Sequence, residues 1–164
     1  MGVGLEDLRV LRDAEVMANS IWRQVMEWEP FAREVVGGQL ARAADSIGAN
    51  IAEAFGRFHF GEKLQFLYYA RGSLFETKYW LNRSLERRLM LPAQASDYAN
   101  QLPGIARQLN AFAGSLKSQR KSGSKQASIV RELPADYVAD VDDDLPLFTE
   151  NELECLQTFP ISNL

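Results

Sequence analysis

The sequence is almost without the residues that build metal and redox sites. It has one cysteine, Cys155, and one histidine, His59, in different regions of the chain. A single cysteine forms no disulfide within the chain, and neither residue has a partner at the spacing of a zinc site. A lone thiol fits a reducing compartment, so we expect a cytoplasmic protein. A single histidine makes no credible Ser/His/Asp or Cys/His arrangement, so we expect no enzymatic activity.

Long apolar runs and phosphate-binding loops are missing too. No stretch approaches the ~20 apolar residues that span a bilayer, and the chain has neither a GxxxxGK[ST] nor a GxGxxG motif. Asp140, Asp142 and Asp144 resemble the start of a calcium loop. Leu145 stands where such a loop needs Gly, however, and Asn151 stands where it needs Glu. We therefore expect no metal, no cofactor and no membrane contact, and we interpret the aspartates as a solvated acidic run.

Charge is distributed unevenly along the 164 residues. Through Lys117 there are 14 Lys and Arg against 13 Asp and Glu, whereas the remaining 47 residues contain 4 against 9. The sequence therefore consists of a nearly neutral body and an acidic tail.

Apolar residues recur at alternating spacings of three and four in four segments, a pattern typical of helices packed against near-parallel neighbours. It predicts helices over residues 5–28, 31–58 and 62–89, and a fourth over residues 91–116. Connections this short favour antiparallel neighbours. The sequence predicts an all-α protein, with an antiparallel up-down four-helix bundle over residues 5–117 and a C-terminal acidic extension.

Glycine and proline suggest irregularities within two of these helices. Gly37 and Gly38 predict a late start or a loosened first turn in the second helix, and Gly48 predicts a close backbone approach. Pro103 predicts a kink or a break in the fourth helix.

Two stripes, one apolar and one polar, run side by side along the second helix. The apolar stripe comprises Val36, Leu40, Ala43, Ile47, Ile51, Ala54 and Phe58. The polar stripe comprises Gln39, Arg42, Ser46, Asn50, Glu53 and Arg57. Polar residues of the two central helices can satisfy each other's donors and acceptors, which favours a structural network of Asn50, Glu53, Arg71, Ser73 and Glu76. The alternative is that three arginines meet phosphates through their planar guanidinium groups: Arg42, Arg57 and Arg71.

The third helix is apolar on nearly all sides. A helix of this kind is buried on more than one face, and one bundle core cannot cover it all. We therefore predict a homo-oligomer, with Phe75, Tyr79 and Trp80 as candidate interface residues. The alternative is that these aromatic residues only thicken the core.

The tail, residues 118–164, begins as a polar linker and contains the signals for one short helix. Thr149 and Glu152 have the spacing of a capping box, and Phe148 and Leu153 that of a hydrophobic staple. We expect a helix over residues 149–158 that docks on a groove of a neighbouring subunit or of a protein partner. The candidate docking residues are Phe148, Leu153, Leu156 and Phe159. The alternative is a frayed end, because isolated helices of this length are marginal in water.

Two blocks carry a family resemblance, QLARAADSIGANIAEAFGR and, after a short loop, FLYYARGSLFE. They contain a Gln-x-x-Arg-Ala, Ser-Ile, Asn-Ile-Ala-Glu core and an Ala-Arg-Gly-Ser-x-x-Glu core. On these residues the chain resembles the four-helix-bundle proteins of the ribosomal-RNA intervening-sequence family, from residue 5 to residue 117. One departure is Gly48-Ala49, where the family usually has proline after Ser-Ile.

The resemblance implies a non-enzymatic bundle that assembles into a ring, usually a pentamer. It also implies a relationship to the accessory ring protein of diversity-generating retroelements, which binds a reverse transcriptase and nucleic acid. Two functions follow as expectations. The first is an oligomeric scaffold or adaptor that presents several acidic tails to a protein partner, because repeated copies raise avidity. The second is a nucleic-acid-binding accessory protein that acts with a reverse transcriptase or another RNA or DNA enzyme, although the nearly neutral body weakens this expectation.

Overall fold

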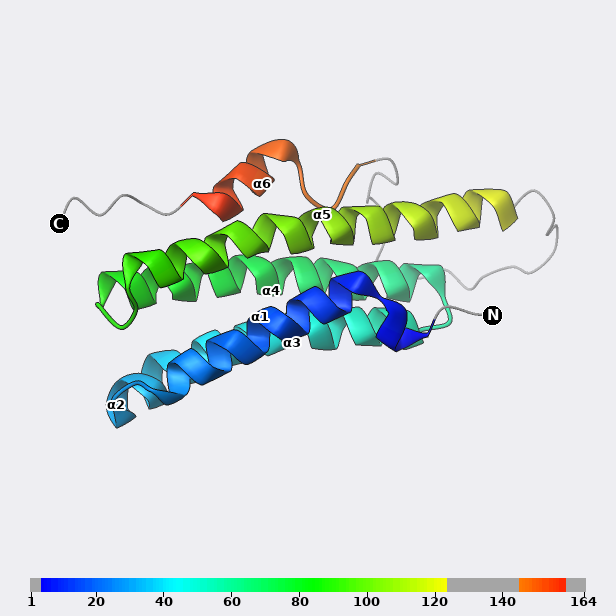
Figure 1. Cartoon of the computed structure of the whole chain (residues 1–164). Coiled ribbons are helices and arrows are strands. Elements are labelled where there is room, and N and C mark those ends of the chain that lie inside the picture. The colour runs from blue at the N-terminus through cyan, green and yellow to red at the C-terminus, as the bar shows by residue number, and fades with distance from the viewer. Residues whose placement is uncertain (1–3, 124–144, 159–164) are drawn as a thin grey trace.

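The computed structural model describes residues 4–123 and 145–158, and every regular element within these stretches is helical (Figure 1). The predicted all-α class is therefore confirmed. No helix in the two described stretches is long and apolar enough to cross a membrane. In chain order the elements are a 3-10 turn (Leu5–Asp7), α1 (Arg9–Met26), α2 (Pro30–Ala32), a π-helical turn (Arg33–Gly37), α3 (Gly38–Gly56), α4 (Phe60–Glu86), α5 (Pro92–Gly123) and α6 (Glu150–Gln157).

The four long helices α1, α3, α4 and α5 pack around one core. α3 contacts both α1 and α4, and α5 contacts both α4 and α1, so the set of helix contacts closes on itself. The chain reverses direction from each long helix to the next (Figure 1). Three side-chain hydrogen bonds join α1 to α5. The hydroxyls of Ser20 and Tyr98 lie 3.1 Å apart, Gln108 Nε2 donates to Asp13 Oδ2 at 2.6 Å, and Gln94 Nε2 donates to Gln24 Oε1 at 2.6 Å.

The predicted apolar stripes form this core. The stripe of the second predicted helix is buried from Val36, in the π-helical turn, to Ala54 of α3. Phe58, predicted to continue it, is 90% exposed because α3 ends at Gly56 and the helical periodicity ends with it. Leu91, predicted to begin the stripe of the fourth helix, is also exposed. The largest fully buried core side chains of the four long helices are Met17, Ile21, Leu40, Ile47, Ile51, Leu64, Leu67, Leu74, Leu81, Leu102 and Leu109.

The second predicted helix is present as α2, the π-helical turn and α3 in continuous succession. Pro30 occupies its first turn, where a missing N–H costs nothing. The predicted loosening is the π-helical turn, which ends at Gly37. A Cβ atom at Gly37 would lie 2.4 Å from Val25 Cγ1, whereas one at Gly48 would lie 3.5 Å from Leu11 Cδ1, an ordinary contact. The close approach predicted at Gly48 was therefore wrong, and the tight contact with α1 is at Gly37.

α5 runs through Pro103 without a break. The predicted break was wrong because Leu102, Ile105 and Ala106 around the proline are all buried in the core, and this packing offsets the ~3 kcal/mol that an internal proline costs. α5 also continues past the predicted boundary at Lys117 to Gly123. Basic residues in its last turn favour this extension, because cations stabilise the C-terminal end of a helix.

Candidate functional site

The three candidate arginines lie in different surroundings. Arg42 is exposed on α3. Arg57 follows the end of α3, forms an ion pair with Glu53, and places its guanidinium carbon 4.8 Å from the centre of the Phe66 ring. Arg71, on α4, is held by the C-terminal segment. The structure therefore does not gather these arginines into one binding surface.

The predicted polar network between α3 and α4 forms only in part. Asn50 Nδ2 donates to Ser46 O at 2.8 Å and to Ser73 Oγ at 3.3 Å, which joins the two helices. Glu53 and Arg71, both members of the predicted network, do not pair with each other. Glu53 pairs instead with Arg57, four residues later in the chain, and this i,i+4 spacing needs no tertiary contact. Glu76 is exposed on α4.

The expected short helix in the tail is present as α6, and its start has the predicted capping box. Thr149 is the N-cap, and its Oγ1 accepts from Glu152 N at 3.4 Å while Thr149 N donates to Glu152 Oε2 at 2.9 Å. Two of the first N–H groups of the helix therefore have a partner next to them. Phe159, one of the candidate docking residues, lies outside the described residues.

Four apolar side chains of this segment are buried on the chain's own bundle. Leu147, Phe148, Leu153 and Leu156 are at most 3% exposed and belong to the same core cluster as the long helices. α6 lies along α5 (Figure 1), and the rings of Phe148 and Phe75 of α4 are 5.8 Å apart. α6 thus docks on a groove formed by α4 and α5 of its own chain, where the sequence had predicted a groove on a neighbouring subunit or a protein partner.

Polar contacts hold the backbone that leads into α6. The side-chain amide of Asn110 of α5 makes two hydrogen bonds with the backbone of Phe148: Nδ2 donates to Phe148 O and Oδ1 accepts from Phe148 N, each at 2.8 Å. Lys117 Nζ donates to Leu145 O at 2.8 Å. Arg71 Nε donates to Leu147 O at 2.7 Å. These hydrogen bonds involve only backbone atoms of the segment. Its apolar side chains are buried against α4 and α5.

Arg71 makes a charged link to α6. Its Nη2 forms an ion pair with Glu152, and the guanidinium carbon lies 5.0 Å from the Phe75 ring centre and 5.5 Å from that of Phe148. The backbone hydrogen bond of Thr149 lowers the pKa of Glu152; burial opposes this shift, and the charge of Arg71 adds to it. Glu152 is thereby favoured in the ionised form that Arg71 requires.

Charge is segregated between the groove and the segment that fills it. Residues 63–75 of α4 and 98–123 of α5 contain no Asp or Glu, and residues 132–164 contain no Lys or Arg. On α5, Arg107, Asn110, Lys117 and Lys121 recur at helical spacing on one side. We call Arg71, Arg107, Lys117 and Lys121 the basic face. Counting the whole body as neutral conceals this local excess of positive charge.

Residues 6–111 match the family model described as 23S rRNA-intervening sequence protein. The chain belongs to the 23S rRNA-intervening sequence protein family. The match includes Arg71 and Asn110 but ends before Lys117 and before α6. A comparison with curated proteins found no match. In this intervening-sequence family protein, the docked segment therefore lies outside the residues that match the family model.

Sequence reasoning missed a buried lysine in this family member. Lys78 lies on α4 and is 6% exposed, and burial lowers its pKa to about 8, while the nearby Cys155 of α6 acts in the opposite direction. The signal was present in the sequence, because Lys78 is four residues after Leu74 and three before Leu81, inside the apolar stripe. No comparable signal marked Asn110, whose role depends on a segment far along the chain.

The three candidate interface residues also differ in exposure. Phe75 is half-buried against Phe148, and Trp80 packs partly buried against the core. Tyr79 is 53% exposed, with its ring 5.1 Å from that of Trp80. The docked segment thus covers part of the apolar surface that led to the prediction of an interface on α4.

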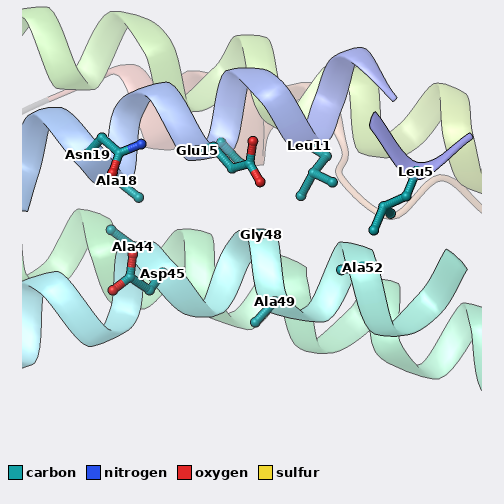
Figure 2. A pocket seen from close by; sticks show the side chains of 11 residues that line it. Leu5, Leu11, Glu15, Ala18, Asn19, Ala44, Asp45, Gly48, Ala49 and Ala52 are labelled. Atoms are coloured by element: carbon teal, nitrogen blue, oxygen red, sulfur yellow. The ribbon is translucent and has the colours of Figure 1, made fainter. Parts of the chain in front are cut away.

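A groove of about 400 Å³ separates α1 from α3 (Figure 2). Its floor is made of small side chains, and the polar residues at its rim are Glu15 and Asn19 on α1 and Asp45 on α3. Two carboxylates at the rim repel phosphate, so this groove does not suit a nucleic-acid backbone.

Proposed function

We propose that this family member is a non-enzymatic, cytoplasmic protein that binds nucleic acid through the basic face of α4 and α5. The observation that carries the proposal is the absence of acidic residues from 63–75 of α4 and 98–123 of α5, two helices that contact each other. Phosphate contacts come mostly from Arg and Lys and supply most of the affinity of non-specific binding. The name of the family, which refers to ribosomal RNA, supports a nucleic-acid partner.

The arrangement of the long helices supports the antiparallel up-down four-helix bundle predicted for residues 5–117. In such a bundle the first half of α4 lies beside the second half of α5, and the position of Arg120 agrees, with its guanidinium carbon 4.9 Å from the centre of the Phe60 ring. The two acid-free stretches then form one continuous surface. The basic face is a product of this topology.

Salt-dependent binding of labelled single-stranded RNA tests this function. Arg107→Ala is expected to weaken binding several-fold and to reduce the slope of log K against log salt by ~0.7, the value for one phosphate contact on a single strand. Fluorescence anisotropy of the full-length protein from low to physiological salt gives both quantities.

Arg42→Ala is the matched control, because it removes the same charge from α3, outside the basic face. Its slope is expected to stay at the wild-type value. Equal effects of Arg42→Ala and Arg107→Ala would show that net charge, rather than the basic face, determines binding and would contradict the proposal.

The adaptor role expected from the sequence requires α6 to leave its groove. In the docked state Leu153 and Leu156 are buried, so α6 presents only its exposed side to a partner. A reverse transcriptase or another RNA or DNA enzyme is the class of protein partner that fits a nucleic-acid-binding accessory. We therefore propose that, as an adaptor, the protein presents its acidic tail to such an enzyme.

A homo-oligomer, most simply a pentamer, is the second part of the proposal. Four large apolar side chains flank the turn between α1 and α2 and are 47–78% exposed: Trp22, Met26, Phe31 and Val35. Exposed apolar surface of this kind is typical of contacts between subunits. We infer that this corner contributes to the interface, in addition to Tyr79 on α4.

Native mass spectrometry at micromolar concentration tests the assembly. The wild-type protein is expected to be a pentamer, and Phe31→Ser is expected to shift it to smaller species because a polar side chain leaves the interface imperfectly packed. Tyr79→Ser is the matched comparison for the α4 surface. A wild-type monomer would contradict the assembly, and an intact pentamer in Phe31→Ser would exclude the corner from the interface.

A further inference from the structure

We propose that residues 145–158 are a tethered competitor of nucleic acid, which occupies Arg71 and Lys117 and leaves the basic face before a phosphate backbone binds there. This inference rests on the proposed function. It adds a regulation that follows from the contacts of the docked segment.

The docked segment occupies two donor groups of Arg71. Its Nε is used by Leu147 O and its Nη2 by the carboxylate of Glu152. A phosphate oxygen pair binds a guanidinium group through the same planar fork of N–H donors. Glu152 and a phosphate therefore compete for the same donors, and the two bound states exclude each other.

The docked segment also contacts Lys117 and Phe75. Lys117 donates to Leu145 O, and Phe75 is half-buried against Phe148. When the segment leaves, Lys117 loses this acceptor and the ring of Phe75 loses its aromatic neighbour. Tyr79, 53% exposed, lies one helical turn beyond Phe75 on α4. A surface of Arg and Lys with aromatic rings at this spacing is suited to single strands, whose bases stack on the rings.

The docked segment, residues 145–158, is negatively charged. α6 contains Glu150, Glu152 and Glu154, and the chain has no Lys or Arg after Arg131. The segment thus brings negative charge to a face from which acids are absent, as a nucleic acid does. Because it is part of the same chain, it competes at the high effective concentration of an intramolecular partner.

The expected consequence is a weaker apparent affinity in the docked state. When only a fraction of the molecules is open, the apparent dissociation constant equals the intrinsic constant divided by that fraction. Variants that release α6 are therefore expected to bind single-stranded RNA about tenfold or more tightly than the wild type, if a tenth or less of the wild-type protein is open.

The test compares three full-length variants. Phe148→Ala removes the aromatic anchor, and Glu152→Gln removes the charge that pairs with Arg71. Glu154→Gln removes the same charge from an exposed position on α6 and is the matched control. Hydrogen exchange of residues 150–157 reports docking, exchange of α1 to α5 reports the integrity of the bundle, and anisotropy with labelled single-stranded RNA reports binding.

We expect Phe148→Ala and Glu152→Gln to lose protection from hydrogen exchange in α6 and to keep it in the long helices. Both variants are expected to bind RNA more tightly than the wild type. Glu154→Gln is expected to keep both wild-type values. Release of α6 with an unchanged RNA affinity would overturn the competition but leave the proposed function standing. Equal tightening by Glu154→Gln and Glu152→Gln would also overturn it, in favour of general charge repulsion. No RNA binding by any variant, released or not, would remove the proposed function and this inference together.

Discussion

Lys78→Met is expected to raise the free energy of unfolding by about 1–3 kcal/mol at neutral pH. Burial lowers the pKa of Lys78 from 10.5 to about 8, and each pKa unit corresponds to 1.36 kcal/mol between the two protonation states. The folded protein thus bears the cost of a charged, desolvated lysine at pH 7. Met fills a similar volume without that cost. Urea unfolding of both proteins gives the difference.

The sign of the pH dependence provides a second check. The folded pKa of Lys78 lies below the unfolded value, so the unfolded chain binds more protons between about pH 8 and pH 10.5. The free energy of unfolding of the wild type therefore increases relative to that of Lys78→Met as the pH rises through this window. The advantage of Lys78→Met is expected to narrow there. Lys63→Met, on the same helix but less buried, is the control and is expected to change stability by no more than about 0.5 kcal/mol.

Gly37→Ala and Gly38→Ala are expected to have opposite effects on stability. At Gly37 the new methyl group would lie 2.4 Å from Val25 Cγ1 and 3.4 Å from Trp28 Cε3. A valine in a helix is held in one rotamer, so it cannot turn aside easily. Overpacking of this kind costs about 1–3 kcal/mol, more than the ~1 kcal/mol gained when alanine replaces glycine in a helix.

At Gly38 the nearest atom to a new methyl group is Arg33 O, at 3.9 Å. Here only the gain in helix propensity is left, so Gly38→Ala is expected to stabilise the protein by up to ~1 kcal/mol. Thermal unfolding followed by circular dichroism compares the adjacent variants directly. A Gly37→Ala variant as stable as Gly38→Ala would show that α1 and the π-helical turn separate without cost.

The long helices were predictable because their signals are repeated many times. Each stripe has several apolar residues at spacings of three and four, and the burial of Leu11, Ile21, Leu40 and Leu109 follows from those spacings. The predicted ends of the helices were less accurate, because fewer residues determine where a helix ends. Phe58 has the right spacing for the α3 stripe, but nothing after Gly56 continues the helix that would bury it.

The candidate site was predictable only in its parts. Arg71 was a candidate, and so were Phe148 and Leu153, but nothing in the sequence linked them. An arginine on a polar stripe has several carboxylates within plausible reach, and the choice of Glu152 over Glu53 depends on a fold that brings together residues 81 positions apart. The basic face was hidden in a similar way, because a sum over the body averages acid-free stretches with acidic ones.

The sequence by itself determined the all-helical class, the four apolar stripes and the start of α6. These features rest on contacts between residues three or four apart, such as the capping box of Thr149 and Glu152, so the local pattern is sufficient. Only the tertiary structure decided that Gly37 lies tight against α1 and that residues 145–158 dock over Arg71. Each of these depends on which helices become neighbours and at what height, and no local pattern contains that information.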